Sequence, residues 1–358
     1  MNCLAENNKI RIETFSLFEA CANEPLRTAF SELESVHFQY GCDWLTNLAE
    51  HSLHTGESTA ILTATDCSGN VAALAVKIDS GKRQAHALGN FYTSAFSPLL
   101  SDDNSDQLLA ALFEHLARTK AVVEIILSPM NTADPAFSLL PSAMRNGGWK
   151  GVHTFPCFGN WVYQLKNQSW NEYIDSRPSR VRNTLRRKSR KFFDSDRGDL
   201  ELIQSGEDLQ RGICEFNSVY AKSWKKAEPF PDFIPGLLRL SAARGWLRLG
   251  IAHYDNEPIA AQIWLVNKGT AYIFKLAYDG DHANLSPGTV LTAFMMKNAI
   301  EMDRVVRIDY MSGDDPYKQD WMSERNEFQG VSGYNARTSR GVLRLTAHKL
   351  KKIFKQLV

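Results

Sequence analysis

Two periodicities in the hydrophobic positions divide the first half of the chain into strands and helices. Alternation with period two predicts strands, and apolar residues at helical spacing predict helices. The predicted strands cover residues 9–15, 59–65, 71–78, 85–92 and 121–127, with a further pair at 149–165 around a turn at 156–159. The predicted helices cover residues 24–36, 42–51, 106–118 and 135–145. These elements describe a complete α/β unit.

The second half repeats this order of elements. Helices are predicted at residues 177–193, 208–224 and 231–244, and strands at 200–203, 246–254, 259–267, 271–278 and 305–310, with two strand-like pieces around 326–334. In both halves, hairpin strands are followed by strand, helix, strand, helix and closing strands. The sequence therefore predicts a duplicated organisation without sequence identity.

The stretch from Ala271 to Trp321 has the order strand, loop, helix, strand and short helix. Ser286, Pro287 and Gly288 open its long helix, and Thr289 lies near the start. The start of a helix has unpaired backbone N–H groups and the positive end of the dipole, which together favour an anion. This stretch therefore predicts a phosphate-binding loop and helix start.

Composition is that of a soluble globular protein, with 44% hydrophobic and 23% charged residues in 358. No apolar run reaches the roughly 18 residues of a membrane span, and the N-terminus has no signal-peptide core, so we expect a cytoplasmic protein. The cysteines and histidines show no metal-binding spacing, so no metal is expected and the thiols are expected to be reduced and buried. The cysteines are Cys3, Cys21, Cys42, Cys67, Cys157 and Cys214.

Charge is unevenly distributed between the two halves. Residues 1–165 carry 10 Lys and Arg against 17 Asp and Glu, whereas residues 166–358 carry 31 against 23. An acidic ligand is therefore expected in the second half, although part of the excess could face the acidic half.

The order of hairpin, KLAYD, SPG loop, helix and IDYMSGDDPYKQDW resembles the acyl-CoA N-acyltransferase (GNAT) superfamily in its tandem form, as in CelD-like and FemAB-like acyltransferases. The resemblance implies an α/β (α+β) fold of two GNAT-like domains, each a mixed, mostly antiparallel sheet flanked by helices. It implies a degenerate domain at residues 1–165 and a domain with the donor and active site at 166–336, before a basic helix at 337–358. The family's phosphate loop has Arg or Gln and then Gly where this chain has Ala283 and Ser286.

The resemblance also implies where the ligands bind. The pyrophosphate of the donor, an acyl-CoA whose acyl group is not specified, is expected on Ser286, Pro287, Gly288 and Thr289. From the residues themselves, Lys275 and Tyr278 of the preceding strand are also expected beside the donor, because a lysine inside an apolar strand needs a partner or water. Lys275 could instead lie on an uncovered sheet face. Tyr220 and Trp224 are expected near the acceptor pocket, with packing in the core as the alternative.

Acyl transfer to an amine needs a base, oxyanion donors and an acid for the leaving group. We predict Asp309 or Asp314 as the base or amine-orienting group, Tyr317 as the acid for the leaving thiolate, and Lys318 on a phosphate or carboxylate. The alternative is that Asp314 caps the short helix that contains Tyr317 and that Lys318 is a solvated surface charge.

Two basic segments suggest anionic partners. Arg177 to Lys191 holds eight basic residues and no acid, which fits a nucleotide phosphate, an anionic acceptor, tRNA, the acidic first domain or a solvated helix. From Arg337 onward there are seven basic residues and no acid. Because Leu343, Ala347, Leu350, Phe354 and Leu357 recur there at helical spacing, this helix could lie on an anionic membrane surface or dock on the protein itself.

The sequence thus predicts an enzyme that transfers an acyl group from acyl-CoA to an amine of a small molecule or of a cell-envelope or polysaccharide precursor. One alternative is a FemAB-like aminoacyl transferase that uses charged tRNA. The other is a GNAT-fold protein that binds a ligand without catalysis.

Overall fold

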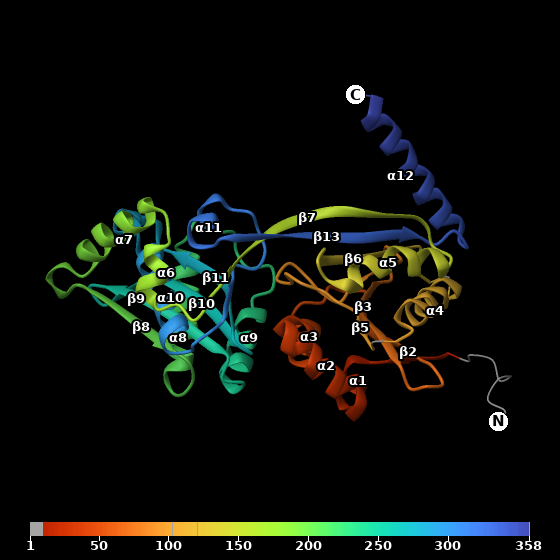
Figure 1. The fold of residues 1–358 in the computed structure, drawn as a ribbon, viewed down its shortest axis with the longest axis horizontal. Helices are drawn as coiled ribbons and strands as arrows, with labels where there is room; N and C mark the ends of the chain where they lie inside the picture. Colours follow the sequence, from red (N-terminus) through yellow and green to blue (C-terminus); the bar gives the residue numbers. More distant parts are fainter. Residues whose placement is uncertain (1–9, 102, 120, 358) are drawn as a thin grey trace. The chain divides into compact units, whose positions relative to one another are not determined.

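A computed structural model describes residues 10–357 except 102 and 120, and within it the side chains of residue 195 and residues 352–357 are not described (Figure 1). The chain divides into two compact units. The first unit is Met1–Phe158 together with Glu327–Val358, and the second is Gly159–Asn326. Among the described residues, no helix combines the length and the apolar character that crossing a membrane requires.

The first unit is a mixed sheet with helices on it. Its strands pair in the order β1-β2-β3-β4-β6-β13, antiparallel except for β4 with β6, and the short β5 pairs with β3. The bounds are β1 Arg11–Phe15, α1 Leu17–Ala22, α2 Glu24–Val36, η1 Phe38–Tyr40, α3 Cys42–His51, β2 Glu57–Thr65, β3 Val71–Asp79, β4 Gln84–Ala87, β5 Leu99–Leu100, α4 Ser105–Arg118, β6 Glu124–Asn131, α5 Pro135–Asn146, β7 Lys150–Gln164, β13 Glu324–Tyr334 and α12 Ser339–Leu357.

The second unit repeats this arrangement. The end of β7 begins the order β7-β12-β11-β10-β9-β8, which is antiparallel except for β11 with β12. The bounds are α6 Trp170–Asp175, α7 Ser179–Phe192, η2 Asp194–Asp196, β8 Gly198–Ile203, α8 Asp208–Ala221, α9 Phe233–Ala243, β9 Leu247–Tyr254, β10 Glu257–Asn267, β11 Thr270–Tyr278, η3 Gly280–Leu285, α10 Pro287–Glu301, β12 Arg307–Asp309 and α11 Pro316–Trp321.

The predicted fold class is confirmed, because each unit has an antiparallel meander whose last strand is joined through a helix to a parallel neighbour. In the first unit β2, β3 and β4 precede α4 and β6, and in the second β9, β10 and β11 precede α10 and β12. Strand–helix–strand crossovers of this kind keep parallel strands adjacent.

Two predicted strand pairs are wrong. Residues 150–164 form the single strand β7 without a turn at 156–159, and residues 324–334 form the single strand β13. The end of β7 pairs with β12 of the second unit, whereas β13 pairs with β6 of the first. Strand β7, the last of the first half of the sequence, thus extends the sheet of the second unit. Strand β13, the last of the second half, extends the sheet of the first unit. The units consequently divide at 158/159 and 326/327, not at the expected 165/166 and 336/337.

Helix α10 is the central helix of the second unit. It is apolar on nearly every side, as a helix covered on both faces must be. The sheet strands β9 to β11 lie against one face, and α6 and α7 cover another. The fit is close, because a Cβ at Gly250 of β9 would lie 2.4 Å from Sδ of Met295 in α10. This packing fixes where the first turn of α10 points.

Candidate active site

A cavity of about 540 Å³ lies within the second unit. The parallel pairing of β11 with β12 ends at Tyr272 and Asp309, and residues beyond these two points line the cavity together with the first turn of α10. In open α/β sheets, ligands collect where neighbouring strands part in this way. The lining residues are Arg180, Val181, Thr184, Trp224, Lys225, Leu276, Tyr278, Gly288, Thr289, Thr292, Tyr310, Asp315, Tyr317, Asp320 and Trp321.

The start of α10 reaches this cavity. Ser286 precedes the helix in the left-handed conformation (φ 52°, ψ 50°), and its carbonyl accepts from the N–H groups of Thr289 (3.0 Å) and Val290 (3.2 Å). No side chain caps the helix. Gly288 and Thr289 line the cavity, whereas Ser286 and Pro287 of the predicted loop do not.

A buried hydrogen-bond network holds the first turn of α10 on strand β10. The Nε2 of Gln262 donates to the carbonyl of Gly288 (3.1 Å) and to Oγ1 of Thr292 (2.7 Å). The Nε1 of Trp264 in turn donates to Oε1 of Gln262 (2.9 Å). Because Gln262 and Thr292 are buried, losing one partner would leave costly unpaired polar groups. The network therefore fixes the helix start relative to the sheet.

Aromatic rings form two walls of the cavity. The rings of Trp224 and Tyr278 are 4.6 Å apart, and Tyr310 packs edge to face with Tyr317 at 5.8 Å. Trp224 is 60% exposed and Tyr317 43% exposed, so both lie where the cavity opens to solvent. Burial raises the pKa of Tyr317 and raises that of Tyr310 well above its ordinary value. Both phenols are therefore protonated at neutral pH and can donate.

Lys225 is a lining residue that sequence reasoning missed. Burial, with a contribution from the nearby charge of Lys275, lowers the pKa of Lys225 to about 8. Roughly a tenth of this amine is consequently neutral at pH 7, far more than of an ordinary lysine. The signal in the sequence was its position directly after Trp224, in the segment expected to border the acceptor.

The cavity also has charged lining residues that are already paired. Arg180 of α7 donates from Nε to Oδ1 of Asp320 in α11 at 2.8 Å. Asp315, which precedes α11, lines the cavity as well. This wall thus presents one guanidinium and two carboxylates.

Asp309, predicted as the base, is buried and does not line the cavity. Its Oδ1 accepts from Nδ2 of Asn160 (2.6 Å) and from the N–H of Met311 (2.7 Å), and its Oδ2 pairs with Arg307 (3.1 Å). A carboxylate with these partners stabilises the turn after β12. It has no access to a ligand in the cavity.

Asp314 and Lys318 lie outside the cavity lining as well. Asp314 accepts from Nε of Arg325 (3.0 Å) and from Nε1 of Trp161 (2.7 Å), and these bonds lower its pKa. It does not cap α11, whose N-cap residue is Asp315. Lys318 is only 5% exposed and donates to the carbonyls of Ser312 (2.6 Å) and Gly313 (3.2 Å). It fixes the loop before α11 and is not a solvated charge.

Lys275 and Tyr220 lie behind the cavity wall. The Nζ of Lys275 pairs with Oε1 of Glu228 at 2.6 Å, and burial lowers the pKa of Lys275. The hydroxyl of Tyr220 donates to the carbonyl of Lys226 at 3.2 Å. Of the predicted site residues, the structure thus brings five together in the cavity lining, namely Trp224, Tyr278, Gly288, Thr289 and Tyr317.

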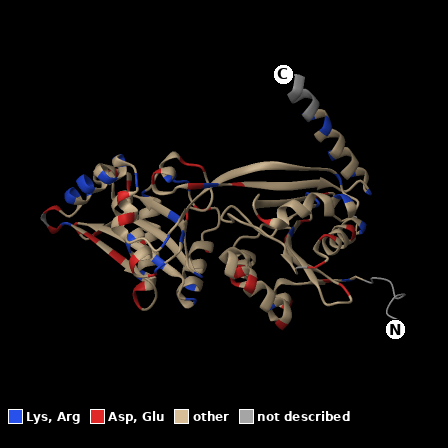
Figure 2. Cartoon of the chain, viewed as in Figure 1, with Lys and Arg blue, Asp and Glu red and all other residues tan. Residues whose placement is uncertain are grey.

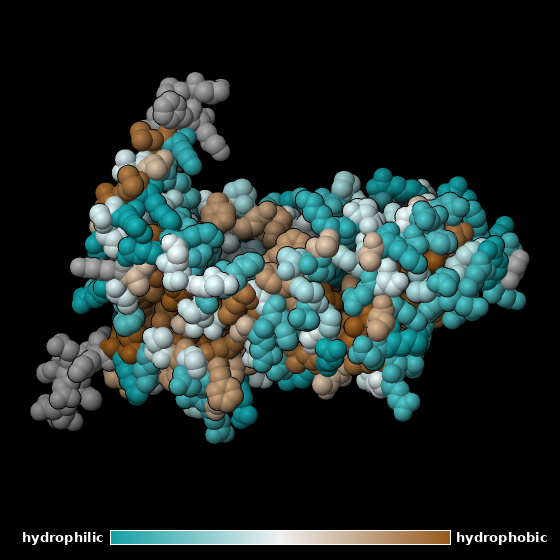
Figure 3. All heavy atoms as spheres, turned by 180° about the vertical axis from the view of Figure 1, so that it is seen from behind, coloured by the Kyte–Doolittle hydropathy of each residue, from teal (hydrophilic) through white to brown (hydrophobic). Residues whose placement is uncertain are grey.

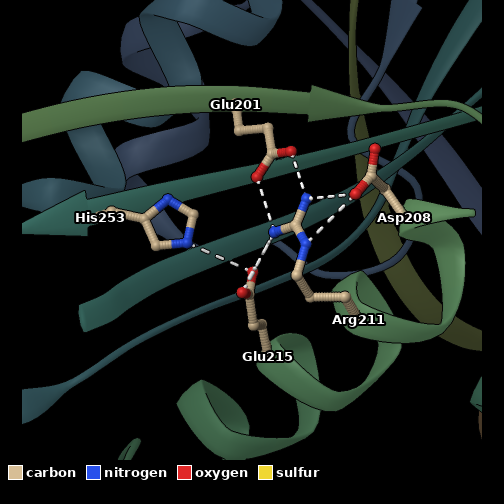
Figure 4. A network of polar contacts seen from close by, with 5 residues as sticks. All are labelled: Glu201, Asp208, Arg211, Glu215 and His253. Carbon is tan, nitrogen blue, oxygen red and sulfur yellow. Dashed lines mark hydrogen bonds and ion pairs between the residues drawn. The ribbon is translucent and has the colours of Figure 1, made fainter. Parts of the chain in front are cut away.

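A separate polar cluster joins β8, α8 and β9 (Figure 4). Carboxylate oxygens of Glu201 and Glu215 and a ring nitrogen of His253 lie within 4.8 Å of one another, a spacing compatible with a metal ion. The guanidinium of Arg211 lies among them, bonded to Glu201 (2.9 Å), Glu215 (3.1 Å) and Asp208 (3.1 Å). Arg211 thus supplies the positive charge that these carboxylates require.

Comparison with known proteins agrees with the fold. Residues 179–319 match the family described as an acetyltransferase (GNAT) domain. No curated protein matches the sequence.

Several solved structures share the fold over most of the chain. A tandem GNAT protein from the clavulanic acid biosynthesis pathway has a TM-score of 0.57 at 10% identity, covering 92% of this chain and 100% of that one. FemX has a TM-score of 0.57 at 10% identity, covering 90% and 96%. A conserved protein of unknown function from Bacteroides thetaiotaomicron has a TM-score of 0.53 at 12% identity, covering 91% and 100%. At these identities the likeness concerns the fold alone. The chain is therefore a tandem GNAT-fold protein whose second unit contains the matched GNAT domain.

Proposed function

We propose that the second unit transfers an acyl group from an acyl-CoA thioester to an amine of a small molecule or of a cell-envelope or polysaccharide precursor. The observation that supports this most is the cavity where β11 and β12 part, because it joins an uncapped helix start to an aromatic chamber. A helix start accommodates the donor's pyrophosphate, and the chamber accommodates the thioester and acyl group. Gly288 and Thr289 are the residues we assign to the pyrophosphate.

The proposed reaction is attack of the acceptor amine on the thioester carbonyl carbon. The C–N bond forms and the C–S bond breaks. Lys225 in its neutral form takes the proton lost by the amine, and the phenol of Tyr317 gives its proton to the leaving thiolate. Lys225 replaces Asp309 and Asp314 in this role, because both carboxylates are engaged outside the cavity.

We assign donor binding to the second unit alone. In the first unit, β4 and β6 pair in parallel like β11 and β12, but the loop after β4 closes on the partner strand. The N–H of Phe96 in this loop donates to the carbonyl of Pro129 in β6 at 2.7 Å. The cavity that is left there is smaller, at about 270 Å³. The closed loop and the smaller cavity agree with a first unit that binds no donor.

Thermal unfolding with CoA, acetyl-CoA and longer acyl-CoAs, followed by an assay for released thiol, tests the proposal. Acyl-CoA should raise the melting temperature, and an acceptor amine should then release CoA. Tyr317→Phe should bind the donor normally but transfer roughly 100-fold more slowly, since a positioned acid contributes about that much or more. No shift with any thioester, together with tRNA binding that falls steeply with salt, would favour the aminoacyl-tRNA alternative. Donor binding without turnover for any amine would favour a binding protein.

We also propose that α12 contacts an anionic membrane surface. Val342, Leu343 and Leu350 are 45%, 70% and 51% exposed, and Figure 3 shows hydrophobic side chains on the outside of this helix. Arg344 is instead tied to Glu124 of β6 at 2.6 Å, which anchors the start of the helix. An exposed apolar row beside several Lys and Arg residues is typical of a helix that lies in a membrane interface.

Vesicle sedimentation tests the membrane contact. The intact protein should bind vesicles that contain phosphatidylglycerol and not neutral vesicles, and Leu343→Asp with Leu350→Asp should abolish binding. The control pair is Thr346→Asp with Lys349→Asp. It makes the helix more negative than the leucine pair does but leaves the apolar row unchanged. Vesicle binding that survives the leucine substitutions would refute the contact.

A further inference from the structure

One side of α7 runs from the cavity to the loop before α10. Arg180, Val181 and Thr184 of α7 line the cavity. At 100° per residue, Arg187 and Lys191 lie on the same side of the helix as Arg180 and Thr184. Lys188, one turn after Thr184, donates from Nζ to the carbonyl of Asn284 in η3 at 2.6 Å. This side of α7 therefore borders both the cavity and the approach to the phosphate-binding helix start.

The positive charge on this side is largely uncompensated. Figure 2 shows Lys and Arg along α7 with no acidic residue among them. Arg180 pairs with Asp320, but Arg187 and Lys191 are exposed and form no ion pair with any described residue. Like charges one turn apart destabilise a helix, so an anionic ligand would be stabilising here.

We infer that Arg187, Lys188 and Lys191, with Arg180 at the cavity end, form the cavity-side row of α7 and bind the nucleotide phosphate of the donor that lies beyond the pyrophosphate assigned to Gly288 and Thr289. From Arg180 to Lys191 the helix makes 11 residue steps, or roughly 16 Å at 1.5 Å per step, which suits a nucleotide next to a cavity that holds the rest of the donor. The inference rests on the proposed function, because it takes the donor to be an acyl-CoA.

Acidic residues at both ends of α7 favour a nucleotide over a nucleic acid. Asp315 and Asp320 line the cavity at one end of the row, and Asp194 and Asp196 of η2 follow α7 at the other. A ligand with a few phosphates fits between these carboxylates. A longer phosphate backbone along this side would meet them and be repelled.

Two double variants of α7 distinguish direct contact with the ligand from a general effect of the helix's charge on binding. Arg187→Glu with Lys191→Glu reverses two charges on the cavity side, and Arg186→Glu with Arg190→Glu reverses two at the same spacing on a side turned by about 100°. Calorimetric titration should show CoA binding weakened about tenfold or more by the first pair and about twofold by the second, since charge-assisted contacts are short-ranged at physiological salt. Pantetheine, which has no nucleotide, should bind both double variants with the affinity that it has for the wild type.

Each outcome of these titrations has a definite meaning. If both pairs of substitutions weaken CoA binding equally, or if the cavity-side pair also abolishes pantetheine binding, the inference is overturned. The proposed function would remain in place. Failure of the wild type to bind CoA would overturn the proposed function and the inference with it. If the glutamate variants unfold, Arg187→Gln with Lys191→Gln against Arg186→Gln with Arg190→Gln repeats the comparison, and equal affinities for CoA would again overturn it.

Discussion

Lys225 connects the electrostatics of the cavity with the proposed chemistry. Its pKa of about 8 lies below that of an ordinary lysine because burial and the charge of Lys275 disfavour the ammonium form. A base must be deprotonated to act. We therefore expect kcat/KM for acyl transfer to rise with pH through about 8 and to level off above it.

Substitution of Lys225 tests this assignment. Lys225→Met should lower kcat by roughly 100-fold or more and remove the rise near pH 8, since a positioned base contributes about that much. Lys226→Met is the matched control, because Lys226 is exposed and outside the cavity lining. A pH profile that keeps its shape in Lys225→Met would exclude this lysine as the base.

The buried pair of Lys275 and Glu228 should matter for stability. Their side chains are 9% and 14% exposed, with Nζ and Oε1 2.6 Å apart. Lys275→Met removes the cation and leaves a buried carboxylate, which costs about 3–5 kcal/mol of the free energy of unfolding when a buried pair is broken. Urea unfolding of the second unit measures this loss.

The double variant Lys275→Met with Glu228→Gln is the control for that loss. Because it removes both charges, it should recover most of the stability. Equal destabilisation in the single and double variants would show that packing and not charge dominates at this pair.

At the scale of elements, the first turn of α10 decides where a donor can bind. A Cβ at Gly288 would lie 3.4 Å from Cδ1 of Tyr278, which is an ordinary contact. Gly288→Ala should therefore fold normally and gain up to about 1 kcal/mol of helix stability. Gly288→Val adds methyl groups between Tyr278 and the cavity, so it should weaken CoA binding at least about tenfold while leaving the fold intact.

Isothermal titration with CoA compares the two variants. Their order is the informative result, because both substitutions remove the glycine and only valine fills the space in front of the helix start. Equal affinities for the wild type and Gly288→Val would remove the assignment of this turn to the donor.

At the scale of the whole molecule, β13 from Glu327 onward belongs to the first unit although its sequence follows the second. Val331 of β13 is fully buried and lies opposite Leu127 of β6. Val331→Asp buries an unpaired charge and should destabilise the first unit by several kcal/mol, on the order of the larger single-substitution effects. Hydrogen exchange should show lost protection in β2 to β6 and retained protection in β9 to β11.

Leu265→Asp in β10 is the counterpart in the second unit, because Leu265 is also fully buried. It should reverse the pattern of lost protection. If Val331→Asp instead exposes β9 to β11, the sequence-based boundary at 336/337 describes the folding units better than the observed division.

The sequence by itself determined most element types and the duplicated order, because hydrophobic periodicity reports which face of each element is buried. Helices α2 and α3 have the predicted bounds, and the strand, loop and helix around Gly288 lie where predicted. It also identified the residues at the helix start, because a Ser-Pro-Gly sequence before an apolar helix carries its own local geometry.

Only the tertiary structure decided which polar residues are available for chemistry. Asp309 and Asp314 are the right residue type in the right segment, but Asn160 and Arg325, supplied by β7 and β13, already bind them. Lys225 lines the cavity because the chain after α8 packs the ring of Trp224 against that of Tyr278 in β11. Likewise, the pairing of β7 and β13 with the sheet of the other unit depends on contacts between residues far apart in sequence, which no local pattern records.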